Sequence, residues 1–105
     1  MIYTTTDHIP GKEITEVLGV VSGNVVQSKH IGRDIMAGLK SIVGGEIRGY
    51  TEMMTEARNV AIQRMVDEAE SKGANAIVGI RFTTSSIVDG SSEILVFGTA
   101  VRLLR

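Results

Sequence analysis

The longest regular segment of this 105-residue chain runs from Tyr50 to about Lys72 and repeats its apolar residues with the period of an α-helix. Thr51 is placed to cap its start, and Glu52 falls in the early turns, where the helix dipole favours a negative charge. Gly73 is a natural stop. One long helix therefore dominates the predicted fold, and the other elements are arranged around it.

The segment before this helix has the composition of a strand. From Ile14 to Gln27 it is rich in valine, which favours extended structure over helix. Its apolar residues occupy both alternating sets of positions, so both faces of the strand are expected to be at least partly covered. Gly19 and Gly23 are the positions where this strand could bend, bulge or let another backbone approach.

The remaining segments supply a second helix and two more strands. Arg33 to Val43 has the spacing of one helical face. Ala76 to Thr83 alternates with a period of two, Asp89-Gly90 supplies hairpin chemistry, and Glu93 to Leu103 forms the last strand. The residues before Pro10 form a short arm or edge strand.

This order, β-α-α-β-β, predicts an α+β fold. A three-stranded, mainly antiparallel sheet packed on the one long helix is its simplest form. A right-handed crossover makes the first two strands parallel, so the last strand lies between them and is antiparallel to both. The length fits one domain, residues 1–105, since domains usually have about 100–150 residues.

Charge and composition exclude several classes of function. The net charge of −1 gives no basic footprint for a dedicated nucleic-acid binder. The lack of cysteine excludes disulfides, thiolate zinc sites, iron–sulfur clusters and cysteine nucleophiles. No apolar run reaches the ~18 residues of a membrane span, and residues 1–10 lack the pattern of a signal peptide. We therefore expect a soluble cytoplasmic protein without a nucleic-acid or membrane partner.

The apolar surface is larger than one small chain needs. Hydrophobic residues make up 43% and charged residues 22%, against a usual charged share of ~25%. The apolar stripe of the long helix is also wider than one sheet face requires, so its second side should pack on a neighbouring subunit or on the 33–43 helix. The residues of this stripe are Tyr50, Met53, Met54, Ala57, Val60, Ala61, Ile62, Met65, Val66 and Ala69.

Arg58 is a charged residue on this wide stripe. An arginine buried there without a partner would be very costly. One interpretation is that it holds an anionic ligand or a carboxylate across an interface; the other is that its stem packs while its head reaches water. Glu46, Tyr50 and Glu52 are the further candidates for this ligand or interface site.

Two other groups of charges on the helix have simpler interpretations. Arg64 and Glu68 are four residues apart and fit a surface ion pair, which contributes only ~0.3–0.5 kcal/mol. Glu52 and Glu56 share a face and are explained as a solvated first turn near the positive end of the helix dipole.

A divalent metal ion is the cofactor that the sequence leaves open. His8 and His30 are the two histidines, and Asp7 and Asp34 lie near them. His30 and Asp34 share a helical face if the helix begins early enough, and oxygen with imidazole ligands suits several divalent ions. No dense ligand motif is present, so the alternative is that both histidines are loop residues at the ends of elements.

An enzyme using Glu46, Glu52 and Arg58 is a further alternative, but nothing in the sequence indicates a reaction. No serine stands in a G-x-S-x-G pattern, and Gly44-Gly45-Glu46 lacks the patterns of a phosphate-binding loop. We therefore name no catalytic residue.

Several segments, in order along nearly the whole chain, resemble those of the YbjQ family, which carries a heavy-metal-binding description and has no known function. The matching segments are Thr5-Thr6, Ile9-Pro10-Gly11, Leu18-Gly19-Val20-Val21-Ser22-Gly23, Ile42-Val43-Gly44-Gly45, Tyr50-Thr51-Glu52, Ala57-Arg58, Gly73-Ala74-Asn75-Ala76-Ile77-Val78-Gly79 and Gly98-Thr99-Ala100-Val101.

The resemblance implies a dodecin-like β-α-β-β subunit with an added helix, assembled as a homopentameric ring. It brings no ligand set, and the missing cysteines make a soft-metal site less favourable. The likeness to dodecin is one of fold, so it does not transfer flavin binding. From the sequence we therefore expect a ring-forming protein that binds a metal ion or a small ligand between its subunits.

Overall fold

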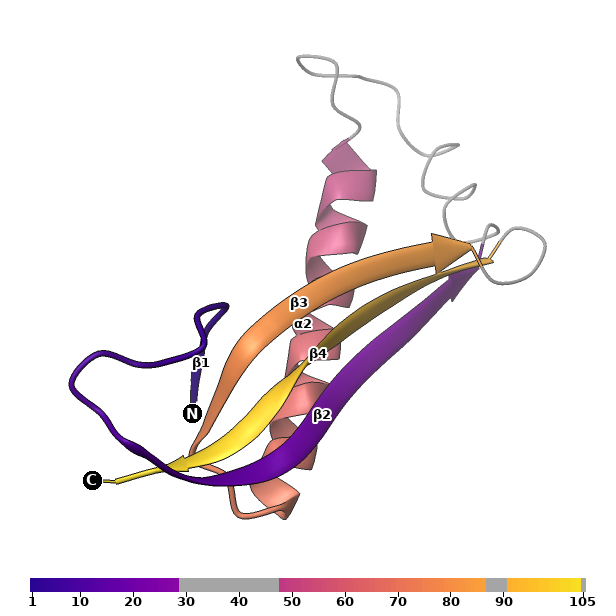
Figure 1. Ribbon diagram of the computed structural model, residues 1–105. Coiled ribbons are helices and arrows are strands. Elements are labelled where there is room, and N and C mark those ends of the chain that lie inside the picture. Colours follow the sequence, from indigo (N-terminus) through magenta and orange to yellow (C-terminus); the bar gives the residue numbers. More distant parts are fainter. Residues whose placement is uncertain (29–47, 87–90, 105) are drawn as a thin grey trace.

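A computed structural model describes residues 1–28, 48–86 and 91–104 of the chain. The predicted helix over residues 33–43 and the predicted turn at Asp89-Gly90 lie outside these residues. Figure 1 shows one long helix and a sheet. The elements are β1 (Ile2–Tyr3), β2 (Ile14–Ser28), α2 (Arg48–Ser71), β3 (Ala76–Ser86) and β4 (Ser91–Leu103).

The sheet is mixed and has the strand order β1-β3-β4-β2. β4 is antiparallel to both β2 and β3, so the last long strand lies where the sequence placed it. The prediction of a three-stranded sheet is wrong, because β1 adds a fourth strand, parallel to β3, through Ile2 and Tyr3. Two residues are too few to show a periodic pattern, which is why the sequence indicated only an arm or an edge strand there.

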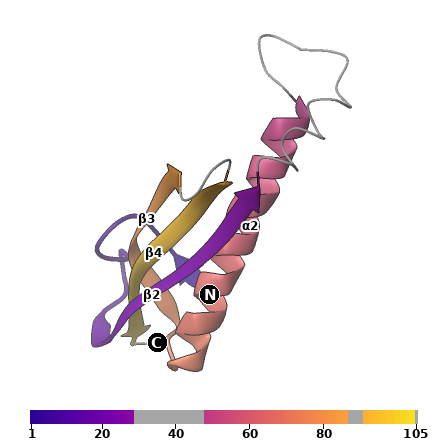
Figure 2. The ribbon, with the colours of Figure 1, turned by 90° about the vertical axis from the view of Figure 1, so that its right-hand side faces the viewer.

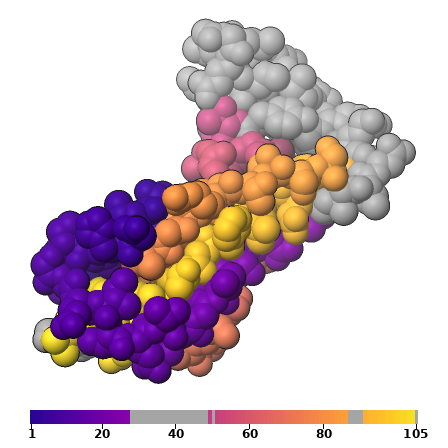
Figure 3. All heavy atoms as spheres, in the orientation of Figure 1, coloured from indigo at the N-terminus to yellow at the C-terminus, as the bar shows by residue number. Residues whose placement is uncertain are grey.

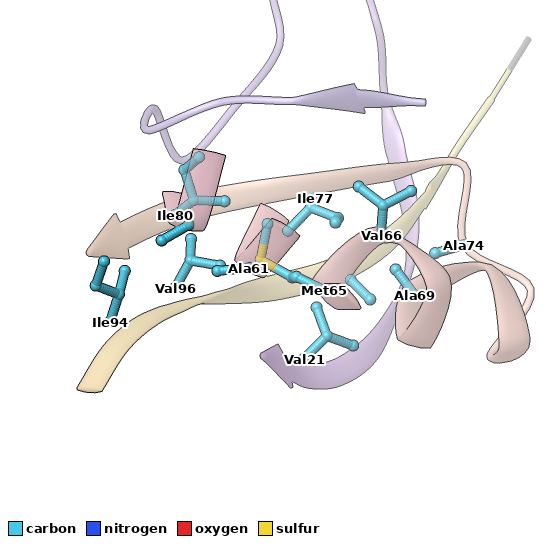
Figure 4. Packing of buried hydrophobic residues seen from close by; sticks show 12 residues of the cluster. Val21, Ala61, Met65, Val66, Ala69, Ala74, Ile77, Ile80, Ile94 and Val96 are labelled. Carbon is cyan, nitrogen blue, oxygen red and sulfur yellow. The ribbon is translucent and has the colours of Figure 1, made fainter. Parts of the chain in front are cut away.

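The helix α2 covers one face of the sheet and lies mainly along β2 (Figure 2). Its small residues Ala57, Ala61 and Ala69 are buried there, with Met65 filling the space between them and the strands. Figure 4 shows Val21 from β2 and Val96 from β4 pointing into the same core. The core is aliphatic, as the composition predicted, and no charged side chain is buried in the described residues.

Both glycines that the sequence singled out in β2 have the predicted roles. Gly19 has a φ of 114° and follows a break in the pairing register with β4 between Val17 and Gly19. Gly23 faces α2 so closely that an added Cβ would overlap the carbonyl oxygen of Ala61 and lie 2.6 Å from the nitrogen of Met65. The strand can therefore bulge at the first glycine and approach the helix at the second.

The ends of α2 agree only partly with the prediction. Gly73 ends the helix with a φ of 82°, while the amides of Gly73 and Ala74 donate to the carbonyls of Glu70 and Ala69 at 3.0 and 3.1 Å. These are the two bonds of a Schellman cap. The N-terminal prediction is wrong: α2 begins at Arg48, so Thr51 lies inside the helix and not at its N-cap.

Residues 4–13 form an arm that runs from the edge of β3 over one end of the sheet face away from α2. The amides of Gly79 and Ile80 donate to the carbonyls of Thr6 and Thr4 at 2.7 and 3.0 Å. Ile9 packs on a small second cluster formed by Ala76, Val78, Val101 and Leu103. In Figure 2 the sheet lies between this arm and α2. Among the described residues, no helix is long and apolar enough to cross a membrane.

Candidate functional site

The face of the sheet away from α2 carries exposed apolar side chains. Cross-strand partners share a face, and Val17 pairs with Val101, which lies in the cluster under the arm. By the same alternation Val20 and Val26 point to this side. We call the exposed residues of this face the open-face patch; they are Val17, Val20, Val26 and Phe97, and they are 67%, 70%, 58% and 37% exposed.

The open-face patch is explained by the composition of β2. The sequence placed apolar residues on both faces of this strand and predicted cover on both sides. The fold covers one side with α2, and the arm covers only one end of the other side. Figure 3 views the sheet from this side, with β2, β3 and β4 forming a continuous surface beyond the arm. Cover for Val20 and Val26 is therefore missing within the described part of one chain.

A second apolar surface lies on the helix side, near β3. Phe82 pairs with Val96, which is buried under α2, so Phe82 faces the helix side of the sheet. The Phe82 side chain remains 44% exposed because α2 runs mainly along β2. At 100° per residue, Ile62 lies about 160° around α2 from Arg64 and Arg58 about 120° from it, and Arg64 reaches β2. That flank therefore faces towards β3. We call Ile62 and Phe82 the β3-side patch.

Arg58 is exposed on this flank. Its Nη2 donates to the hydroxyl of Thr55 at 3.4 Å, a long bond that occupies little of its donor capacity. Within one chain the guanidinium therefore reaches water. Glu52 is also exposed, but six residues along the helix put it on a different side from Arg58.

The structure does not describe the side chains of two of the candidate residues. Tyr50 belongs to the first part of α2 by its backbone, and Glu46 lies outside the described residues. The sequence predicted one site formed by four residues. The structure positions two of these side chains, Arg58 and Glu52, and they lie on separate sides of α2.

The free edge of β2 is held by α2. In the described chain β2 pairs with β4 on one side and has no partner strand on the other. The Nη1 of Arg64 donates to the carbonyl of Asn24 at 2.6 Å, and the amide of Ser22 donates to Oε2 of Glu68 at 3.4 Å. The predicted Arg64–Glu68 surface pair is therefore wrong, because both side chains bind the edge of the strand beneath the helix.

The metal candidates are only partly described. His8 and Asp7 lie on the arm, with Nδ1 and Oδ1 2.8 Å apart and both side chains exposed. The hydrogen bond to His8, and then its charge, hold the pKa of Asp7 below the ordinary 3.8. His30 and Asp34 lie outside the described residues. Within the part of the chain that the structure describes, no three histidine, aspartate or glutamate side chains come together as metal ligands.

A cavity of about 380 Å³ lies at the foot of the sheet, where the sequence gave no sign of one. It is lined by Ile2, Lys12, Asn75, Leu103 and Leu104. Asn75 shapes it, since its amide group donates to the carbonyl of Leu103 at 3.2 Å and accepts from the amide of Leu103 at 2.7 Å. These two hydrogen bonds connect the turn after α2 to the end of β4.

One known protein family matches nearly the whole chain. A family model described as "Putative heavy-metal-binding" matches residues 1–104. The chain belongs to the YbjQ family. It is 86% identical over 104 residues to a UPF0145 protein of Vibrio parahaemolyticus, with 99% of each chain covered. It is 60% identical over 103 residues to a UPF0145 protein of Thermotoga maritima, with 98% of this chain and 97% of that protein covered.

A solved structure supports the YbjQ fold. A protein of unknown function of the DUF74 family from Pediococcus pentosaceus superposes with a TM-score of 0.65 at 18% identity. The match covers 99% of this chain and 98% of that one. At this identity the likeness concerns the fold alone.

Proposed function

We propose that this YbjQ protein is a non-enzymatic, ring-forming homo-oligomer that holds a small anionic ligand or a metal ion between its subunits. The observation that carries the proposal is the open-face patch, whose valines are 58% to 70% exposed on a long strand that is apolar on both faces. Ser22 and Asn24 lie between Val20 and Val26 on this face, so the patch is interrupted by polar residues, but several exposed valines on one sheet face still favour an interface.

Two patches on opposite sides of the sheet favour a ring over a two-fold dimer. A two-fold contact uses the same surface on both partners, whereas a head-to-tail contact joins two different surfaces and closes when the rotation allows. In our proposal the open-face patch of one subunit packs on the β3-side patch of the next. The number of five subunits comes from the family resemblance and not from the geometry.

Arg58 gives this interface a place for an anion. It lies on the flank of α2 that carries Ile62, so a neighbour that covers this flank also excludes water from the guanidinium. A desolvated arginine needs a negative partner, which is either a small anionic ligand or a carboxylate of the neighbouring subunit. The proposed ligand class is therefore a small carboxylate or phosphate.

The test is a substitution on the open-face patch, measured by light scattering on a sizing column. Val20→Asp should convert the oligomer to monomers, because a carboxylate would be buried without a partner. Val20→Thr keeps the branched shape and should leave most of the oligomer intact. An unchanged mass for Val20→Asp, with the protein still folded by circular dichroism, would remove the open-face patch from the interface.

A divalent-metal binder is the second candidate, favoured by the Asp7–His8 pair and by the description of the family. Two adjacent donors are too few for a closed site, so the remaining ligands would come from His30, from Asp34 or from a second subunit. Calorimetry with zinc, copper, nickel and cobalt on untagged protein tests this candidate. Equal binding by the double variant His8→Ala/His30→Ala would exclude the histidines as ligands.

A further inference from the structure

The free edge of β2 is the second feature of this fold that needs an explanation. An edge strand offers unpaired backbone groups to any other chain, and native proteins usually protect it. At 15 residues β2 is long, and its valines make it a good template for strand addition. A protein with an exposed apolar face beside such an edge has two ways to associate, by packing on the face or by extending the sheet.

Two charged side chains of α2 occupy the middle of this edge. Ser22 and Asn24 are two residues apart, so their backbone groups point to the same side of the strand. The carbonyl of Asn24 accepts a short bond from Arg64 at 2.6 Å, and the amide of Ser22 donates a long bond to Glu68 at 3.4 Å, so Arg64 is the stronger of the two contacts. A partner strand in register with β2 would need both of these backbone groups for its own ladder.

The end of β2 nearer the arm is protected in another way. Its register with β4 is broken between Ile14 and Glu16 and again between Val17 and Gly19. Such irregularities bend a strand and interrupt the even spacing that a partner strand requires. Bulges therefore protect the first part of β2, and the two charged side chains protect the centre.

We propose that Arg64 and Glu68 form an edge clasp that blocks strand addition to β2 and so directs a second copy of this chain onto the open-face patch. The identity of the partner, a second copy of this chain, rests on the proposed function. The protection of the β2 edge by Arg64 and Glu68 does not. It favours a closed assembly, because edge-to-edge pairing leaves a new edge for every further copy, whereas a head-to-tail contact between faces closes when the rotation allows.

The experiment compares two double variants on the same helix. Arg64→Ala/Glu68→Ala removes the clasp. Gln63→Ala/Asp67→Ala is the matched control, since this pair has the same spacing and is joined only to itself in the described contacts, by a 2.8 Å bond from Nε2 to Oδ1. Native mass spectra and thioflavin T fluorescence are recorded for both variants and for the wild type.

The clasp variant should form a series of larger species that grows with concentration, with thioflavin T fluorescence raised roughly tenfold or more, as freed edges add strands. The control should keep the wild-type mass. A third variant, Arg64→Lys/Glu68→Gln, retains a donor and an acceptor and should behave as the wild type. Gly73→Ala, which destabilises the C-terminal end of α2 but keeps both clasp side chains, separates loss of the clasp from loss of stability.

Each outcome decides one of the two proposals. If the wild type is a discrete oligomer and the clasp variant keeps its mass, or if Gly73→Ala grows to the same extent at equal stability, the clasp is wrong while the ring is unaffected. If the wild type is a monomer and the clasp variant still forms growing species, the clasp holds and the ring is wrong. If both the wild type and the clasp variant stay monomeric, both proposals are wrong.

Discussion

Gly23 is the residue on which the contact between α2 and β2 depends most directly. An added Cβ would overlap the carbonyl oxygen of Ala61 and lie 2.6 Å from the Met65 nitrogen, and both are backbone atoms that a side-chain rotation cannot move. Gly23→Ala should therefore lower the free energy of unfolding by about 3 kcal/mol, the upper part of the range for overpacking. Chemical denaturation measures this change.

The control for Gly23→Ala is Ser22→Ala. Ser22 is the neighbouring residue, its side chain points away from α2, and its contact with Glu68 uses the backbone amide. It should change stability by less than about 0.5 kcal/mol. Equal stability of both variants would mean that the helix does not lie as close to the strand as described.

Asp7 provides a prediction for acidic pH. Its pKa is lowered first by the hydrogen bond to His8 and then by the His8 charge. A carboxyl whose pKa is depressed in the folded state contributes stability above its unfolded pKa and loses this contribution as the pH falls through the folded value. His8→Ala should therefore bring the pKa of Asp7 back up towards 3.8.

Carboxyl resonances followed through an acid titration by NMR measure this pKa directly. Thr5→Ala, in the same arm, should leave the pKa of Asp7 where it is. Because Asp7 is fully exposed, we expect the effect on the pKa and no sizeable effect on melting. An Asp7 pKa that does not respond to His8→Ala would contradict the assigned pair.

At the scale of elements, the long segments with a clear apolar period were predictable, whereas the two-residue strand was not. The helix predicted from Tyr50 to Lys72 and the strand predicted from Ile14 to Gln27 differ from α2 and β2 by at most two residues at an end. Their apolar patterns are long enough to set the period. The strand β1 has two residues, which no period can reveal.

The candidate site was less predictable, for a physical reason. Arg64 and Glu68 were paired with each other because sequence spacing shows only neighbours within a helix. Their actual partners, Asn24 and Ser22, are 40 and 46 residues away in the chain and become neighbours only when α2 packs on β2. Exposure of Phe82 likewise depends on how far α2 extends over the sheet, and exposure of Val20 depends on how far the arm covers the opposite face; no local pattern contains either.

The cap of α2 gives a prediction at this scale. Gly73 holds a φ of 82°, a conformation that costs other residues about 1–2 kcal/mol. Gly73→Ala should lower the free energy of unfolding by about 1 kcal/mol, and Lys72→Ala, next to it and exposed, should leave it within about 0.5 kcal/mol. A thermal melt compares the two variants. A larger loss for Lys72→Ala than for Gly73→Ala would contradict the cap.

For the whole molecule, the composition and the fold point in the same direction. A chain with 43% hydrophobic residues leaves four apolar side chains of one sheet face exposed. Neither the sequence nor one chain alone fixes how many copies cover this surface, since that number depends on the angle between neighbouring subunits.

The most direct test of ring assembly is a native mass spectrum of the untagged protein. The proposal predicts one discrete species at about five times 11.3 kDa, unchanged on dilution through the micromolar range, and any retained mass would identify the ligand class. A spectrum with only the 11.3 kDa monomer and no adduct would contradict the ring and the interface site together.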